Sequence, residues 1–201
     1  MKSDHYLTVL GTFDEATNEQ LKILDLHLQR EGLKTLGYYQ DAPWHLSLGV
    51  YHHLEKEELI NWTREVAGHM EEITLRFNHI GLFPGVVFIE PAFSWHLRFF
   101  FERLHEKHDD LSGIYIATSK KYGLFTPHAS MIFTDDEMIR SVEILNEHFS
   151  PFYGKMSELM IFEYVQRKGK TFPVGMVEVI KLKKTPPLDE AFGVMGSNLV
   201  P

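Results

Sequence analysis

The chain has 201 residues, with 20 basic and 28 acidic side chains and a formal net charge of −8 at pH 7. This acidic balance argues against extensive binding along a nucleic-acid backbone, which favours a basic face. The chain has no cysteine, which excludes a disulfide framework and any cysteine-ligated metal site. It shows no signal-peptide pattern and no apolar run near the ~20 residues of a membrane helix. We therefore expect a cytoplasmic protein that makes no membrane contact.

Strands and helices are predicted to alternate along most of the chain. Apolar residues that recur every three or four positions favour helices, and alternating apolar residues favour strands. The predicted helices cover residues 14–30, 55–70, 94–108 and 135–148. The predicted strands cover residues 6–13, 43–51, 73–82, 86–90, 125–133, 157–166 and 174–182. Turns are expected at Pro84-Gly85 and at residues 167–170, residues 33–42 are expected to form a loop or short strand, and residues 114–118 are ambiguous.

The order of these elements repeats within the chain. A strand, helix, strand, helix and hairpin are followed by a helix, strand, helix and hairpin. No linker of disordered composition separates the two halves. The pattern predicts one bilobal α+β domain over residues 1–183, followed by a loosely ordered tail over residues 184–201.

A short polar motif occurs once in each half, in His45-Leu46-Ser47-Leu48 and His128-Ala129-Ser130-Met131. Each copy follows a proline and begins a β-rich run. Since neighbouring side chains of a strand point to opposite faces, the histidine and serine of each copy share a face. Two copies of one polar pair indicate a single site between the halves.

Paired histidines suit acid–base chemistry at a phosphate. Cleavage of a phosphodiester needs one group that accepts a proton from the attacking oxygen and another that donates one to the leaving oxygen. Histidine serves both roles because its ordinary pKa is about 6.5. Hydroxyl groups beside the two imidazoles can stabilise the charge on the nonbridging oxygens. The chain has 12 histidines, so one such motif is weak evidence, and the prediction depends on the repeat.

The two motifs resemble the paired His-x-Ser/Thr-x signatures of the 2H phosphoesterase superfamily, which includes 2′,5′ RNA ligase-like proteins and cyclic nucleotide phosphodiesterases. Residues 125–128 and the hairpin that includes Phe172-Pro173 are also similar to these proteins. Serine stands in both motifs where threonine is more frequent, and it retains the donor hydroxyl. The resemblance implies a duplicated fold with two antiparallel sheets, helices outside and a central cleft between pseudo-symmetric lobes.

The resemblance also implies roles for the motif residues. It implies that His45 and His128 are general acid and base, in an order that the sequence leaves open, and that Ser47 and Ser130 bind the phosphate. We expect the substrate to be a 2′,3′-cyclic or 2′,5′-linked phosphodiester of a nucleotide or RNA end. Ligation in the reverse direction uses the same groups. No cofactor and no metal site are predicted, and we expect a monomer.

Three alternatives remain at this point. Strand alternation places Tyr51 on the His45 face, as a residue lining the site or as part of the core. A non-catalytic module that holds a nucleotide or RNA end is the main competing function. A metal-dependent hydrolase is a third, because His105 and His108 lie three residues apart on a predicted helix, before Asp109-Asp110.

Overall fold

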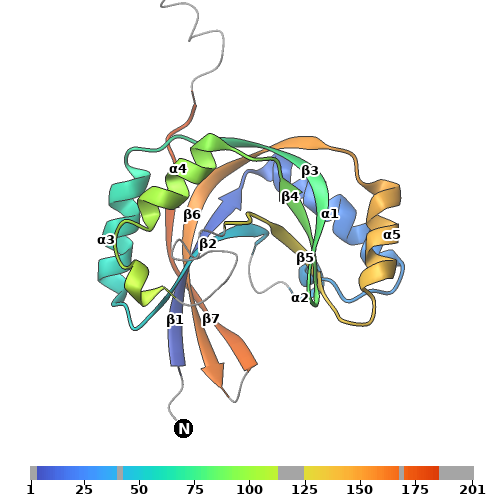
Figure 1. Cartoon of the computed structure of the whole chain (residues 1–201), viewed down its shortest axis with the longest axis horizontal. Helices are drawn as coiled ribbons and strands as arrows, with labels where there is room; N and C mark the ends of the chain where they lie inside the picture. Colours follow the sequence, from blue (N-terminus) through green and yellow to red (C-terminus); the bar gives the residue numbers. More distant parts are fainter. Residues whose placement is uncertain (1–3, 40–42, 113–124, 168–169, 186–201) are drawn as a thin grey trace, which may run out of the picture.

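The computed structural model describes residues 4–39, 43–112, 125–167 and 170–185 (Figure 1). Its strands are β1 (Asp4–Phe13), β2 (His45–His52), β3 (Ile73–Phe83), β4 (Val86–Pro91), β5 (Ala129–Phe133), β6 (Phe152–Arg167) and β7 (Lys170–Lys181). Its helices are α1 (Glu15–Arg30), the single turn α2 (Leu36–Tyr39), α3 (Lys56–Ala67), α4 (Trp95–Leu104) and α5 (Met138–His148), with a 3₁₀ turn η1 (Asp109–Leu111). The predicted α+β class and element order are confirmed.

The seven strands form one antiparallel sheet in the order β2-β1-β6-β3-β4-β5, and β7 also pairs with β6. Strand β6 joins the two halves because it pairs with β1 through residues 156–166 and with β3 through residues 152–156. The two predicted sheets are therefore continuous through β6. Figure 1 shows that this sheet bends into an arch.

The longer helices lie on the outside of the arch, as predicted (Figure 1). Helices α3 and α4 contact each other and cover the half that contains β2 and β7, while α1 and α5 contact each other and cover β3, β4 and β6. The apolar core lies between these helices and the sheet. Its fully buried members include Val9, Leu21, Leu46, Leu59, Phe77, Phe100, Leu145 and Ile161.

Local capping explains where several helices begin and end. The side chain of Asp14 accepts a hydrogen bond from the backbone N–H of Thr17 at 3.0 Å, which fixes the start of α1. Ser94 caps α4 in the same way through the N–H of Leu97 at 3.3 Å. Helix α4 ends at Leu104, four residues before the predicted end, because His105 caps it and His108 takes a left-handed conformation with φ 62°.

The remaining predictions divide into observed elements and residues outside the described ranges. The turn predicted at Pro84-Gly85 is present, and Gly85 has φ 75°. The predicted 167–170 turn lies partly outside the described residues, and residues 114–118 and 186–201 lie wholly outside. In the part of the chain that the structure describes, no helix is long and apolar enough to cross a membrane.

The capping contact of α1 generates a stability prediction. Replacing Asp14 by alanine leaves the Thr17 N–H without its side-chain acceptor, and we expect the free energy of unfolding to fall by about 1 kcal/mol. Urea denaturation followed by circular dichroism measures this change. The control is Glu19→Ala on the same helix, which removes only the exposed ion pair with Lys22 and should change stability by less than about 0.5 kcal/mol. Equal effects of the two substitutions would contradict the capping role.

Candidate active site

The two histidine motifs lie on the two edge strands of the sheet. His45 is the first residue of β2, and His128 immediately precedes β5. These strands stand at opposite ends of the strand order, yet they contact each other because the sheet curls (Figure 1). A protonated His128 lowers the pKa of His45 by charge repulsion. The fold thus brings together residues that are 83 positions apart in the chain.

Both histidines are oriented by the same backbone contact. The Nδ1 of His45 lies 2.7 Å from the carbonyl oxygen of Pro43, and the Nδ1 of His128 lies 2.8 Å from the carbonyl oxygen of Thr126. Since a carbonyl oxygen can only accept, Nδ1 carries the hydrogen in both rings. The other ring nitrogen, Nε2, is then the one that accepts a proton when neutral and donates one when charged.

Prolines help to present these two carbonyl groups. Pro43 supplies one carbonyl itself, with its φ fixed by the ring. Thr126 supplies the other, and it is held in an extended conformation because Pro127 follows it. In both copies the accepting carbonyl belongs to the residue two positions before the histidine.

Each motif is also followed by a β-bulge at the same position. In β2, Ser47 pairs with Leu10 and Gly49 with Val9, so Leu48 is the extra residue. In β5, Ser130 pairs with Phe88 and Ile132 with Val87, so Met131 is the extra residue. Bulges are frequent next to active sites, where they redirect a side chain. The internal duplication therefore extends to backbone geometry, which the residue pattern did not reveal.

The β2 bulge corrects the prediction that Tyr51 lines the site. Strict alternation places Tyr51 on the face of His45, but the extra residue Leu48 reverses the alternation after it. Tyr51 is consequently fully buried in the core, and its ring packs so closely against Gly49 that a Cβ there would lie 2.7 Å from it. Burial, with Asp109 as a smaller cause, raises the pKa of the Tyr51 hydroxyl.

The inner face of β2 instead presents four side chains. By register, His45, Ser47, Val50 and His52 lie opposite Thr12, Leu10, Thr8 and Tyr6 of β1. His45 and Ser47 are half-buried, as are His128 and Ser130 in the second motif. All four predicted site residues are therefore partly accessible to solvent, and their chemical roles stay predictions.

The surroundings of the two histidines favour their neutral forms. Burial lowers the pKa of His45, and the positive charge of a protonated His128 lowers it further, while the bond to the Pro43 carbonyl acts in the opposite direction. Burial likewise lowers the pKa of His128, against the raising effect of the Thr126 carbonyl.

Two aromatic rings that the sequence analysis missed surround His128. The Phe83 ring meets the imidazole edge to face, with centroids 5.1 Å apart and an interplanar angle of 88°, and the Phe88 centroid lies at 4.9 Å. These rings bury part of the imidazole surface. No comparable aromatic pair contacts His45 within the described residues, so the two halves of the site differ chemically.

The helix histidines do not form the metal site considered above. Both ring nitrogens of His105 are occupied, with Nδ1 2.7 Å from Asp109 Oδ1 and Nε2 2.8 Å from the Leu48 carbonyl oxygen. His108 lies 3.6 Å from Glu58 instead. Among the described residues, no three or more histidine, cysteine or acidic side chains are placed to share one ion.

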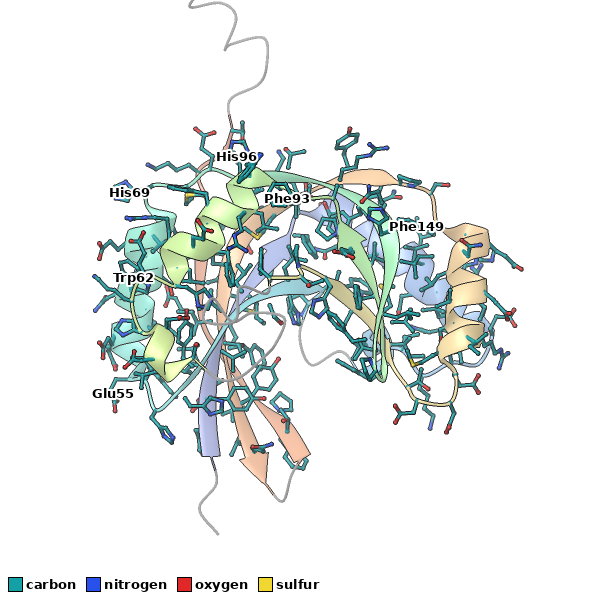
Figure 2. The ribbon with its side chains drawn as sticks, viewed as in Figure 1. Glu55, Trp62, His69, Phe93, His96 and Phe149 are labelled. Carbon is teal, nitrogen blue, oxygen red and sulfur yellow. The ribbon has the colours of Figure 1, made fainter. Side chains whose placement is uncertain are left out.

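A hollow of about 510 Å³ on the flank of α3 is also a poor phosphate site. Its lining includes Trp62 and four glutamates, Glu55, Glu57, Glu58 and Glu65. Figure 2 places Glu55 and Trp62 at the outer flank, away from the strands that hold the motifs. This concentration of negative charge opposes phosphate binding.

Comparison with known proteins identifies the class of fold. No family model matches the sequence, and no curated protein matches it. The structure is similar to Escherichia coli LigT in its apo form, with a TM-score of 0.60 and 14% identity over 90% of this chain and 99% of that chain. It is also similar to the protein TT0787 of Thermus thermophilus, with a TM-score of 0.62 and 16% identity over 89% of this chain and 98% of that one. A structure described as a phosphoesterase matches with a TM-score of 0.57 and 13% identity over the same shares as LigT.

The chain thus has the fold of LigT and of this phosphoesterase over nine-tenths of its length. This fold is the one that the resemblance to 2H phosphoesterases predicted.

Burial of Tyr51 generates a prediction that separates core from site. Its hydroxyl has no hydrogen-bond partner among the described residues, and a buried unpaired hydroxyl costs about 1–3 kcal/mol. We expect Tyr51→Phe to leave turnover unchanged and to keep or raise the free energy of unfolding. Thr8→Val is the control, because it removes a buried hydroxyl that does donate, to the Phe162 carbonyl at 3.2 Å, and should lower stability by about 1 kcal/mol. A large loss of turnover in Tyr51→Phe would contradict the placement of Tyr51 in the core and would indicate that it contributes to the site.

Proposed function

We propose that this chain is a metal-independent phosphoesterase that acts on a 2′,3′-cyclic or 2′,5′-linked phosphodiester of a nucleotide or RNA end. His45 and His128 are its general acid and base, and Ser47 and Ser130 bind the phosphate. One observation carries the proposal. The two imidazoles occupy mirrored positions, each with Nδ1 on the carbonyl oxygen two residues before it.

This arrangement supports proton transfer at two sides of one phosphorus. One Nε2 accepts the proton of the attacking water or hydroxyl, while the other, charged at the outset, donates its proton to the leaving ribose oxygen. The serine hydroxyls donate to the nonbridging oxygens, where negative charge develops. In the reverse direction the two histidines exchange roles, so the same site has the groups for ligation.

The structural neighbours support a nucleotide or its phosphate as the ligand. LigT has been crystallised with 3′-AMP, ATP, NADP⁺ and phosphate. The first three ligands are nucleosides that carry phosphate groups, and the fourth is free phosphate. A site of two histidines and two hydroxyls suits this chemistry, and the net charge of −8 favours recognition of a short end over a long backbone.

The competing proposal is a binding module that holds the same ligands without turnover. The retained histidines in both halves favour catalysis, because binding alone needs neither the mirrored Nδ1 contacts nor a chargeable Nε2. A binding module holds a 2′,3′-cyclic nucleotide unchanged, whereas the enzyme opens the ring.

Substitution of the motif residues tests the two-histidine mechanism. We expect His45→Ala and His128→Ala each to lower turnover of a 2′,3′-cyclic nucleotide by about 10²–10⁴-fold, the usual contribution of a general acid or base. Ser47→Ala and Ser130→Ala should cost less. The control is His79→Ala, an exposed histidine of β3 that lies outside both motifs. Near-parent turnover in either motif-histidine variant, with the fold intact by circular dichroism, would contradict the mechanism.

The lowered pKa values of both histidines predict the pH dependence of kcat/KM. Activity needs one neutral and one charged histidine, so the profile is bell-shaped, with limbs set by the macroscopic pKa values of the pair in the free enzyme. Because both values lie below the ordinary value of about 6.5, we expect the maximum of kcat/KM below pH 6.5. The bound phosphate favours the charged imidazoles, so the maximum of kcat should lie at higher pH.

Both profiles are measured on a 2′,3′-cyclic nucleotide with and without EDTA. A maximum of kcat/KM well above pH 7 would contradict the lowered pKa values. Loss of activity with EDTA, restored by a divalent ion, would contradict the metal-independent proposal.

A further inference from the structure

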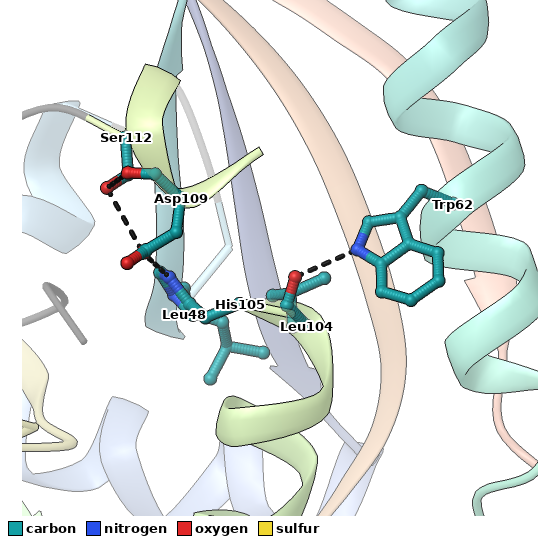
Figure 3. A network of polar contacts seen from close by, with 6 residues as sticks. All are labelled: Leu48, Trp62, Leu104, His105, Asp109 and Ser112. Carbon is teal, nitrogen blue, oxygen red and sulfur yellow. Dashed lines mark hydrogen bonds and ion pairs between the residues drawn. The ribbon is translucent and has the colours of Figure 1, made fainter. Parts of the chain in front are cut away.

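The bulge of β2 is held from outside the strand by a buried histidine. His105, the residue that caps α4, is only 2% exposed. Its ring contacts two oxygen atoms, with Nε2 2.8 Å from the Leu48 carbonyl oxygen and Nδ1 2.7 Å from Asp109 Oδ1. Figure 3 shows the contact with Asp109. We call these three groups, His105, the Leu48 carbonyl and the Asp109 carboxyl, the His105 clamp.

The clamp needs one more hydrogen than a neutral imidazole and a carboxylate provide. A neutral imidazole carries one N–H, and a backbone carbonyl and a carboxylate both only accept. Two short contacts to two acceptors therefore need two hydrogens, either both on the ring or one of them on Asp109. The clamp is complete only while this second proton is bound.

The clamp contacts the catalytic strand at a sensitive position. Leu48 follows Ser47 directly and is the extra residue at which the alternation of inner-face and core-facing side chains in β2 reverses. On the other side, Ser112 donates its hydroxyl hydrogen to the Asp109 carbonyl at 2.6 Å and forms a β-bridge with Tyr51. The end of α4, η1 and β2 are thus joined around the bulge.

The second motif has no such support. Among the described residues, no side chain donates a hydrogen bond to the carbonyl of Met131, the corresponding bulge residue of β5. The clamp is therefore a feature of one half of the site, added to the duplicated geometry.

On the basis of the proposed function, we infer that His105 is a positioning residue for catalysis: with Asp109 it forms a proton-dependent clamp on the β2 bulge that aims His45 and Ser47 at the phosphate. Loss of the second proton leaves one acceptor facing a bare ring nitrogen. The remaining hydrogen stays on Nδ1, because the ionised Asp109 carboxylate is a stronger acceptor than a backbone carbonyl. The Leu48 carbonyl then faces a bare Nε2, so the bulge is released and the site-facing end of β2 loses its fixed direction.

Few charged or titratable groups compete for this proton. Tyr51 of β2 approaches with its ring centroid 6.1 Å from that of His105, and Asp109 is the acidic partner from η1. On α4 itself the nearest ring is Phe101, at 4.2 Å. From α3, Glu58 pairs with His108 and not with His105. Asp109 is thus the acidic group in direct contact with the His105 ring.

A matched substitution tests the proton requirement directly. In Asp109→Asn, the amide N–H donates to Nδ1 while Nε2–H still donates to Leu48, so a neutral imidazole satisfies every contact. Nitrogen-15 NMR of the histidine side chains near neutral pH should show the clamp's second proton in the parent and a singly protonated His105 ring in Asp109→Asn. A neutral, singly protonated His105 beside an ionised Asp109 in the parent would overturn the inference.

Kinetics on a 2′,3′-cyclic nucleotide test the positioning role. We expect His105→Leu to lower kcat by about 10–100-fold, as small misplacements of catalytic groups do, with a smaller change in KM. Asp109→Asn should keep most of the parent's kcat, and the ratio of its kcat to that of the parent should rise with pH. His108→Asn is the control for the helix end, because asparagine tolerates the left-handed backbone there. Parent-level kcat in a folded His105→Leu, or a ratio independent of pH, would overturn the positioning role.

A separate readout distinguishes failure of this inference from failure of the proposed function. Inactivity of the parent itself on cyclic nucleotides would refute the proposed function. The clamp is then judged by the backbone amide signals of His45 and Ser47, which should shift and broaden in His105→Leu and stay in place in Asp109→Asn. Unchanged signals in both variants would overturn the clamp.

Discussion

The simultaneous pairing of β6 with strands from both halves is the constraint on which the rest of the molecule depends. One edge of β6 pairs with β1 over almost its whole length, and the opposite edge pairs with β3 near its start and with β7 further along. The two halves therefore cannot move apart without breaking backbone hydrogen bonds of a central strand. A strongly twisted and bent sheet of this length brings its edges toward each other, and here those edges carry the two histidine motifs.

Within this frame, the backbone controls the histidines more than neighbouring side chains do. In each motif the carbonyl oxygen two residues earlier takes up the Nδ1 hydrogen, so the ring presents Nε2 without the help of a carboxylate. Burial lowers the pKa of both histidines, and the hydrogen bond to the backbone carbonyl offsets this effect only in part. On the proposed function, the negative charge of the substrate phosphate favours the charged imidazoles, so substrate binding is coupled to protonation.

Much of the fold was predictable because its signals are local. Helical spacing of apolar residues and the capping residue Asp14 located the helices, and the turn residues Pro84-Gly85 located a hairpin. The candidate site could be proposed from the sequence because one motif occurs twice, with His45 in one copy and His128 in the other, and the roles of these residues stay predictions. Tyr51 was placed on the wrong face because the extra residue of the bulge reverses which side chains of β2 face the core. The local sequence feature that can mark such a bulge is Gly49, a glycine within a β-pattern. The bulge at Met131 and the contact of His105 with Leu48 have no such sign, since both depend on which strands and helices meet in space.

The paired bulges also bear on how such a chain can change over time. In a regular strand, every second side chain lies on the same face of the sheet from one end to the other. The positions that face a ligand at one end therefore fix which positions are buried at the other. A bulge interrupts this coupling. The extra residues Leu48 and Met131 shift which positions of the strand are buried, so the buried positions before a bulge and after it are set separately. One strand can thereby satisfy selection for ligand recognition and selection for core packing separately. The two halves can diverge in specificity while they keep a common core.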